Sequence, residues 1–134
     1  MSSKKKDEKK IDKSSGETKG ISNKIKVQKD PLFNIGDIVK HRIYPFRGVI
    51  VDVDPEFSNT EEWYQSIPAE IRPSRDQPYY HLMAENTETF YTAYVSQQNL
   101  VDDGDNGPLE HPDLGEIFSG MEKGKYHLRN EVRN

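Results

Sequence analysis

Short runs of apolar and β-branched residues, separated by turn-forming residues, recur along the chain from Leu32 onward. Runs of this length and composition are typical of β-strands, and alternation within them indicates strands with one buried face. The pattern therefore predicts an all-β domain built as a small five-stranded barrel. The strands are expected at residues 37–43, 48–53, 79–85, 89–95 and 99–101.

The connections between these strands differ greatly in length. Residues 86–88 predict a tight hairpin between the third and fourth strands, because Asn-led turns of this length favour antiparallel pairing. Residues 55–78 form a long loop between the second and third strands, and loops of this length are usually functional or mobile. Within it, residues 58–62 have the composition of a capped helical turn, which would fold Trp63 and Tyr64 back onto the barrel.

The first hairpin can be predicted in more detail from the parity of its strands. The inward-facing residues are expected to be Val39, His41 and Ile43 in the first strand and Val49, Val51 and Val53 in the second. Facing residues of a hairpin share a side of the sheet, so the loop must then hold an odd number of residues, and residues 44–48 meet this condition. The same register places Lys40 opposite Asp52, which would neutralise part of its charge, and leaves His41 half-buried.

Charge divides the chain into two parts. Residues 1–30 hold ten lysines and five acidic residues, with few sizeable apolar side chains, and such a segment cannot offset the entropy cost of ordering it. We therefore predict a disordered, lysine-rich tail at 1–30 and a folded domain at 31–134. The domain carries nine basic and eighteen acidic residues, which disfavours non-specific binding to nucleic acid because affinity for phosphates comes chiefly from Lys and Arg.

The composition argues against several classes of site. The chain has no cysteine, which excludes disulfides, Cys-ligated zinc and a thiol nucleophile. Its four histidines lack the spacing of metal-binding motifs, and Asp52-Val-Asp54 lacks the downstream glycine and glutamate of a calcium loop. No nucleophile elbow or glycine-rich phosphate loop is present. We expect no metal, no cofactor and no catalytic residue, and assign Asp54 and Pro55 to the end of a strand.

The chain also lacks the pattern of a membrane or secreted protein. No apolar run approaches the roughly 20 residues that span a bilayer, and the lysines near the N-terminus precede no apolar signal segment. We expect a soluble, cytoplasmic protein.

Basic and aromatic side chains gather around the loop of the first hairpin. The candidate surface for a partner or for DNA consists of Lys40, Arg42, Tyr44, Phe46, Arg47, Trp63 and Tyr64. In this set, Arg47 is expected to be unpaired beside two aromatic rings at the loop tip. Cations bind phosphates and aromatic rings anchor protein partners, so both kinds of partner stay open on this pattern.

Four separated segments carry a resemblance to a known family. They are FNIGDIVKHRIYPFRGVIVDVDPEF, QPYYHLMAEN, TAYVSQQNLV and HPDLGEIFSGMEKGKYHLRN. In this order they resemble the HspQ family, also described as YccV-like or hemimethylated-DNA-binding domains, and the last segment is similar to its alphaproteobacterial branch. The resemblance implies a small SH3-like β-barrel, with structural motif positions at Gly48, Asp52, Asp54, Pro55, Tyr80 and His81.

The resemblance implies two functions, neither of them catalytic. One is a heat-shock adaptor that promotes degradation of denatured or regulatory proteins, such as DnaA, by ATP-dependent proteases such as Lon or ClpXP. The other is binding of hemimethylated DNA with an effect on replication initiation. Because the domain is acidic, protein partners are the favoured interpretation.

The C-terminal segment is expected to contain at most one helical turn. Leu114, Ile117 and Phe118 would share one face of it. So short a helix must pack on the barrel or on a neighbouring subunit. We expect a homo-oligomer, such as a trimer, because a domain poor in core residues gains stability from a shared interface.

Overall fold

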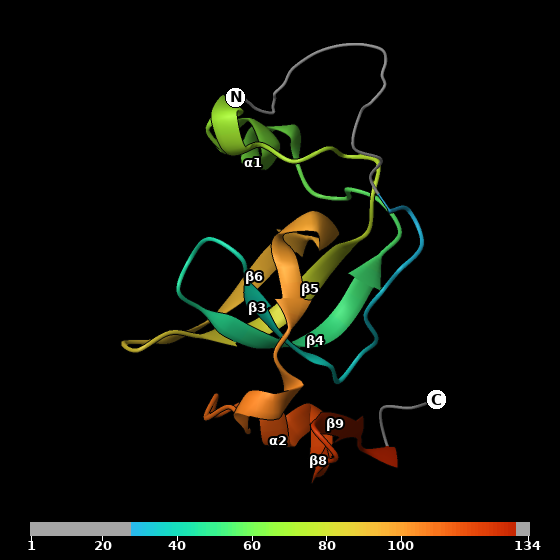
Figure 1. Ribbon diagram of the computed structural model, residues 1–134, viewed down its shortest axis with the longest axis vertical. Helices are drawn as coiled ribbons and strands as arrows, with labels where there is room; N and C mark the ends of the chain where they lie inside the picture. The colour runs from blue at the N-terminus through green and yellow to red at the C-terminus, as the bar shows by residue number, and fades with distance from the viewer. Residues whose placement is uncertain (1–27, 131–134) are drawn as a thin grey trace. The chain divides into compact units, whose positions relative to one another are not determined.

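The computed structural model describes residues 28–130 (Figure 1). Two compact units are present in this range: a sheet unit, Gln28–Phe57 with residues 76–130, and a loop unit, Ser58–Arg75. Among the described residues, no helix is long and apolar enough to cross a membrane. Most of the predicted tail, residues 1–27, lies outside the described range.

The centre of the sheet unit is a five-stranded antiparallel sheet with the order β6-β5-β4-β3-β7. Its strands are β3 (Ile38–His41), β4 (Arg47–Asp54), β5 (Tyr79–Glu85), β6 (Phe90–Ser96) and β7 (Leu100–Asp102). The all-β class is confirmed, and all five predicted strands are present with ends within two residues of those expected. The described edge strands β6 and β7 do not pair with each other, so the closed SH3-like barrel stays a prediction.

The sheet is buried on both faces. One cluster of buried side chains consists of Val39, Ile50, Tyr80, Leu82, Ala84, Val95 and Leu100. The second, on the opposite face, consists of Ile38, Val49, Leu109, Leu114, Phe118 and Tyr126. Consecutive residues of a strand point to opposite faces, so the β3 pair Ile38 and Val39 contributes one side chain to each cluster.

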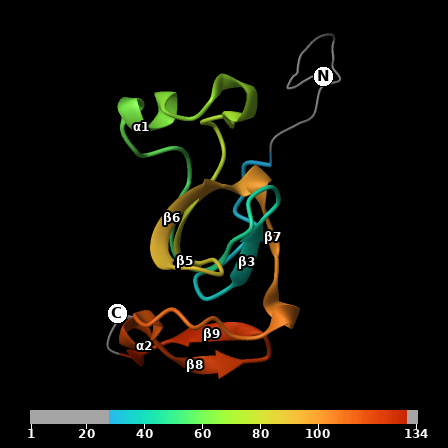
Figure 2. The ribbon, with the colours of Figure 1, turned by 90° about the vertical axis from the view of Figure 1, so that its left-hand side faces the viewer.

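The second cluster is covered by the C-terminal segment, which contains α2 (Leu114–Ile117), β8 (Phe118–Glu122) and β9 (Lys125–Leu128). These elements lie together beside the sheet, as Figures 1 and 2 show. The predicted helical turn is confirmed, and its apolar face packs on the chain's own sheet. The β8–β9 hairpin was not predicted. Its sequence signal is Lys123-Gly124, a two-residue turn in which both residues have positive φ, as a tight hairpin requires.

The predicted register of the first hairpin is wrong. Lys40 lies opposite Arg47 rather than Asp52, and the His41 N–H donates to the Phe46 carbonyl at 3.1 Å. The loop therefore holds four residues, an even number. The parity argument assumed one buried face, whereas burial of both faces removes that constraint. The expectation that His41 is half-buried is confirmed.

A β-bulge at Val51 interrupts the pairing of β4 with β5. Val49 and Val51 pack with the second cluster, but Val53 packs with the first. The prediction that these three valines share a face is therefore wrong. A bulge inserts one unpaired residue and so exchanges the faces of all residues beyond it. Asp52 is brought opposite His81 on β5 by this shift.

The described part of the predicted tail is attached to the sheet by a buried glutamine. The Gln97 Nε2 donates to the carbonyls of Gln28 and Asp30, both at 3.1 Å, and its Oε1 accepts from the Leu32 N–H at 2.8 Å. The Tyr80 hydroxyl also donates to that Oε1. Residues 28–30, assigned to the tail by composition, are thus bound to the sheet unit.

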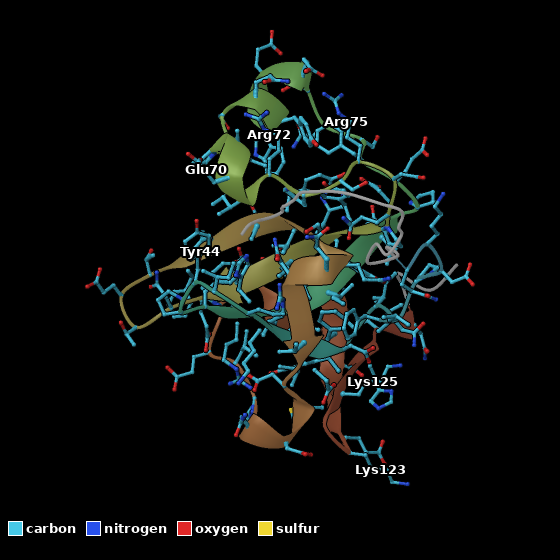
Figure 3. The ribbon with its side chains drawn as sticks, turned by 45° about the horizontal axis from the view of Figure 1, so that its top comes forward. Tyr44, Glu70, Arg72, Arg75, Lys123 and Lys125 are labelled. Carbon is cyan, nitrogen blue, oxygen red and sulfur yellow. The ribbon has the colours of Figure 1, made fainter. Side chains whose placement is uncertain are left out.

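The loop unit contains α1 (Glu61–Gln65) and a 3₁₀ turn at Ala69–Ile71. The predicted helical turn is confirmed, with Thr60 as the N-cap residue whose Oγ1 accepts from the Trp63 N–H at 3.0 Å. Arg75, labelled in Figure 3, binds both carboxylate oxygens of Glu61 at 2.7 and 2.9 Å, and this pairing lowers the pKa of Glu61 to about 2. Placement of Trp63 and Tyr64 against the sheet stays a prediction.

Candidate binding pocket at the first hairpin

An open pocket of about 640 Å³ lies beside the β3–β4 loop, and we call it the hairpin pocket. Its walls come from the β3–β4 hairpin, the β5–β6 turn and the region around β7. Five of the seven predicted surface residues line it: Lys40, Arg42, Tyr44, Phe46 and Arg47. The structure thus brings most of the predicted set together, whereas Trp63 and Tyr64 belong to the loop unit.

The loop takes its shape from His41. Its Nδ1 accepts hydrogen bonds from the backbone N–H groups of Ile43 and Tyr44, both at 3.0 Å. The imidazole centroid lies 4.8 Å from that of Tyr44 and 5.2 Å from that of Phe46. Phe46 in turn meets the edge of Tyr91 at 5.9 Å. The result is an aromatic wall of four rings, of which sequence reasoning missed the role of Tyr91.

The protonation state of His41 is coupled to this arrangement. Burial, and secondly the positive charge of Arg42, lower its pKa from the ordinary value of 6.5. Because Nδ1 accepts two backbone hydrogen bonds, it must be unprotonated for the loop to keep this conformation. A pKa lowered on folding means that stability is complete above the unfolded value and is lost as the pH falls through the folded value.

We expect the loop tip to loosen on acidification below pH 6.5. The amide protons of Ile43 and Tyr44 would lose their acceptor when Nδ1 is protonated. Amide exchange and ¹⁵N relaxation at these two positions, measured between neutral and acidic pH, test the expectation. Unchanged protection of both amides after His41 has titrated would contradict the assignment.

Arg47 is fully engaged inside the protein. Its Nε donates to the Asp103 Oδ2 at 2.7 Å, and its other nitrogens donate to the carbonyls of Asp103, Gly107 and Pro108 at 3.3, 2.8 and 3.4 Å. The Asp103 side chain is only 5% exposed. The prediction that Arg47 is unpaired is therefore wrong. Asp103 lies 56 residues away in the chain, so no local pattern shows this pairing.

The two other cations of the pocket are available to a partner. The Lys40 side chain is exposed and forms no ion pair or hydrogen bond with any described residue. Arg42 is also exposed; its Nε donates to the Gln98 carbonyl at 2.8 Å, and no described carboxylate pairs with it. The charges of Arg47 and Asp103 neutralise each other. Of the other residues that line the pocket, Lys40 and Arg42 are positive and Glu85 is negative. The pocket therefore has a local positive surplus in an acidic chain.

The motif positions implied by the resemblance have structural surroundings. A Cβ at Gly48 would lie 2.9 Å from the Met83 carbonyl oxygen, so strands β4 and β5 approach closely there. Tyr80 is fully buried, and its hydroxyl accepts hydrogen bonds from the backbone N–H groups of Leu32 and Phe33. The remaining positions, Asp52, Asp54, Pro55 and His81, lie at the far end of β4 and on its neighbour β5.

Most of the chain matches a known protein family. Residues 31–125 match the family described as hemimethylated DNA-binding protein YccV like. The chain belongs to the YccV-like family. This match confirms the resemblance found in the sequence, while the narrower similarity to an alphaproteobacterial branch stays a prediction.

Curated relatives extend beyond this domain. F-box only protein 21 of Homo sapiens is 30% identical over 103 residues, which are 76% of this chain and 16% of that protein. The protein of the same name from Mus musculus is 29% identical over 115 residues, or 83% of this chain and 18% of that protein. The chain thus spans less than a fifth of the length of these relatives. No solved structure matches the chain.

Proposed function

We propose that this member of the YccV-like family is a binding module that contacts duplex DNA, and hemimethylated DNA in particular, through the hairpin pocket. The observation that supports it most is which of the three basic residues of the pocket have an acidic partner. Arg47 is neutralised internally, whereas Lys40 and Arg42 project from the same pocket without an acidic partner among the described residues. The description of the matched family supports the same kind of ligand.

The acidic net charge of the chain does not decide against this proposal. Charges are screened beyond about 8–10 Å at physiological salt, so a phosphate responds mainly to the groups nearest to it. Near the pocket those groups are Lys40 and Arg42 against the single carboxylate of Glu85, with the exposed ring of Tyr44 beside them. The two cations would bind phosphates, and the aromatic wall would offer apolar contact to a methyl group on a base edge.

The test is to replace both cations together. The double variant Lys40→Ala/Arg42→Ala should bind a hemimethylated duplex at least tenfold more weakly, measured by fluorescence anisotropy at several salt concentrations. Each lost phosphate contact removes about one unit from the slope of log affinity against log salt, so the slope should become shallower by about two. Tyr44→Ala should mainly reduce the preference for hemimethylated over unmethylated duplex.

A matched control removes a cation far from the pocket. Lys123 lies in the β8–β9 turn, well separated from Tyr44 in Figure 3, and has φ of 56°. Lys123→Asn keeps a residue type that tolerates positive φ and should leave DNA affinity nearly unchanged. Binding that survives in the double variant with an unchanged salt slope would show that the pocket is not the DNA site.

A second candidate function is a protein adaptor for ATP-dependent proteolysis, and the apolar tip of the same loop supports it. Ile43 is 57% exposed and Tyr44 is 47% exposed, and exposed side chains of this kind commonly anchor protein partners. Ile43→Ser/Tyr44→Ser should slow protease-dependent loss of a denatured substrate while leaving the salt slope of DNA binding unchanged. An unaltered degradation rate would remove the support. A homo-oligomer also stays a proposal, which light scattering tests.

A further inference from the structure

Two carboxylates and an imidazole meet on one face of the sheet, at the opposite end of β4 from the hairpin pocket. Asp52 and Asp54 are two residues apart on β4, and His81 lies opposite Asp52 on β5. One ligand atom from each side chain lies within 4.8 Å of the other two. Spacing along the chain did not predict this group, because His81 is 27 residues from Asp54 and only strand pairing brings the two close.

We propose that Asp52, Asp54 and His81 form a binding site for a divalent cation of the zinc type. Three protein ligands from imidazole and carboxylate groups are a common zinc set, with water completing the coordination. Calcium and magnesium prefer all-oxygen sites, so the imidazole makes them poorer occupants. The proposal is independent of the function proposed for the hairpin pocket.

The spacing of the donor atoms suits such an ion. The Nε2 of His81 lies 3.0 Å from the Oδ2 of Asp54. Zinc bonds of about 2.0–2.2 Å place neighbouring tetrahedral ligands about 3.4 Å apart, so this pair needs to open only slightly. The Oδ1 of Asp52 accepts from the N–H of Val53 at 2.9 Å, which leaves its other oxygen as the donor to the ion.

The charge balance of the site also calls for a cation. Two carboxylates share one face of a strand, and among the described residues neither forms an ion pair with a lysine or arginine. The described basic group that pairs with them is His81, which lies beside Asp54 and binds metal in its neutral form. A bound divalent ion would remove the repulsion between the two carboxylates.

Tyr94 supplies the outer support that metal ligands usually have. Its hydroxyl donates to the Oδ2 of Asp54 at 2.8 Å, and its ring centroid lies 4.6 Å from the imidazole of His81. Asp54 and His81 are both partly buried, while Asp52 is exposed. Two ligands are therefore held in place, and the third lies on the side open to solvent.

The experiment is a calorimetric titration of the full chain with zinc chloride. We expect one saturable equivalent, with at least tenfold weaker binding in His81→Gln and in Asp52→Asn. Asp52→Asn keeps the side-chain oxygen that accepts from Val53, so it removes charge with little change to the fold. Titration with magnesium chloride should show binding at least tenfold weaker than that of zinc.

His127→Gln is the matched control. His127 is exposed and lies 3.9 Å from the Glu122 carboxylate, but it belongs to no three-ligand group among the described residues. This variant should bind zinc as the unaltered chain does. Absence of a saturable equivalent, or equal affinity in the unaltered chain and Asp52→Asn, would overturn the proposal.

Discussion

Gly36→Ala is expected to lower the free energy of unfolding by about 3 kcal/mol. Gly36 has φ of 98°, a conformation that costs an L-residue about 1–2 kcal/mol, and forced overpacking adds a further 1–3 kcal/mol. A Cβ at this position would lie 2.2 Å from the carbonyl oxygen of Tyr126. That oxygen belongs to the backbone of β9, so it cannot move aside as a flexible side chain would.

The contact matters because Gly36 joins two parts of the fold. Its N–H donates to the Ile50 carbonyl at 2.8 Å, and its carbonyl accepts from the Tyr126 N–H at 2.9 Å. The alanine variant should therefore loosen the C-terminal hairpin from the sheet as well as lower the urea midpoint. Urea unfolding followed by fluorescence measures the loss.

Gly107→Ala separates the two causes. Gly107 also has positive φ, 82°, but a Cβ there would meet no atom within 4 Å. With ψ of 177° it lies in a region almost exclusive to glycine, so this variant should cost only the conformational part, about 1–3 kcal/mol. Equal losses in the two glycine variants would show that the close approach to Tyr126 contributes nothing.

Arg47→Met is expected to lower the free energy of unfolding by about 3–5 kcal/mol, the usual cost of breaking a buried pair and leaving its partner uncompensated. The substitution keeps much of the side-chain volume but leaves the Asp103 carboxylate, 5% exposed, without its ion-pair partner. It also leaves the carbonyls of Gly107 and Pro108 without their donor. Thermal or urea unfolding measures the loss.

A double variant tests whether the buried charge causes the loss. Arg47→Met/Asp103→Asn removes both charges and should recover part of the stability lost in Arg47→Met, because no unpaired carboxylate remains. Arg42→Met, at an exposed arginine of the same hairpin, should cost much less. If Arg47→Met were as stable as the unaltered chain, the ion pair between Arg47 and Asp103 would not stabilise the fold.

Local features of the sequence predicted the strands well. Each of these features depends on residues close together in the chain: the alternation within strands, the turn at Asn86 and the helix cap at Thr60. The corresponding elements appear in the structure where they were expected or nearby. The β8–β9 hairpin was missed because its apolar residues are few. It is ordered by its packing on the sheet and by contacts such as that of Tyr126 with Gly36.

Five residues of the candidate site could be predicted from the sequence, but which of their charges are paired could not. The five predicted residues that line the hairpin pocket are close in sequence, so their clustering could be inferred from the hairpin alone. Whether each cation is available depends on partners far away, as Arg47 and Asp103 show. The proximity of His81 to Asp52 was missed for the same reason, because it depends on strand register rather than on spacing along the chain.

The bulge at Val51 has a consequence for how the length of this chain can change. Because Val51 pairs with no residue of β5, removing it would make Ile50 and Asp52 consecutive residues of a regular strand and would leave the pairing and facing of every later position unchanged. Asp52 would stay opposite His81, and Val53 would keep its packing against the first cluster. The chain can therefore lose this one residue of β4 without reversing the strand beyond it.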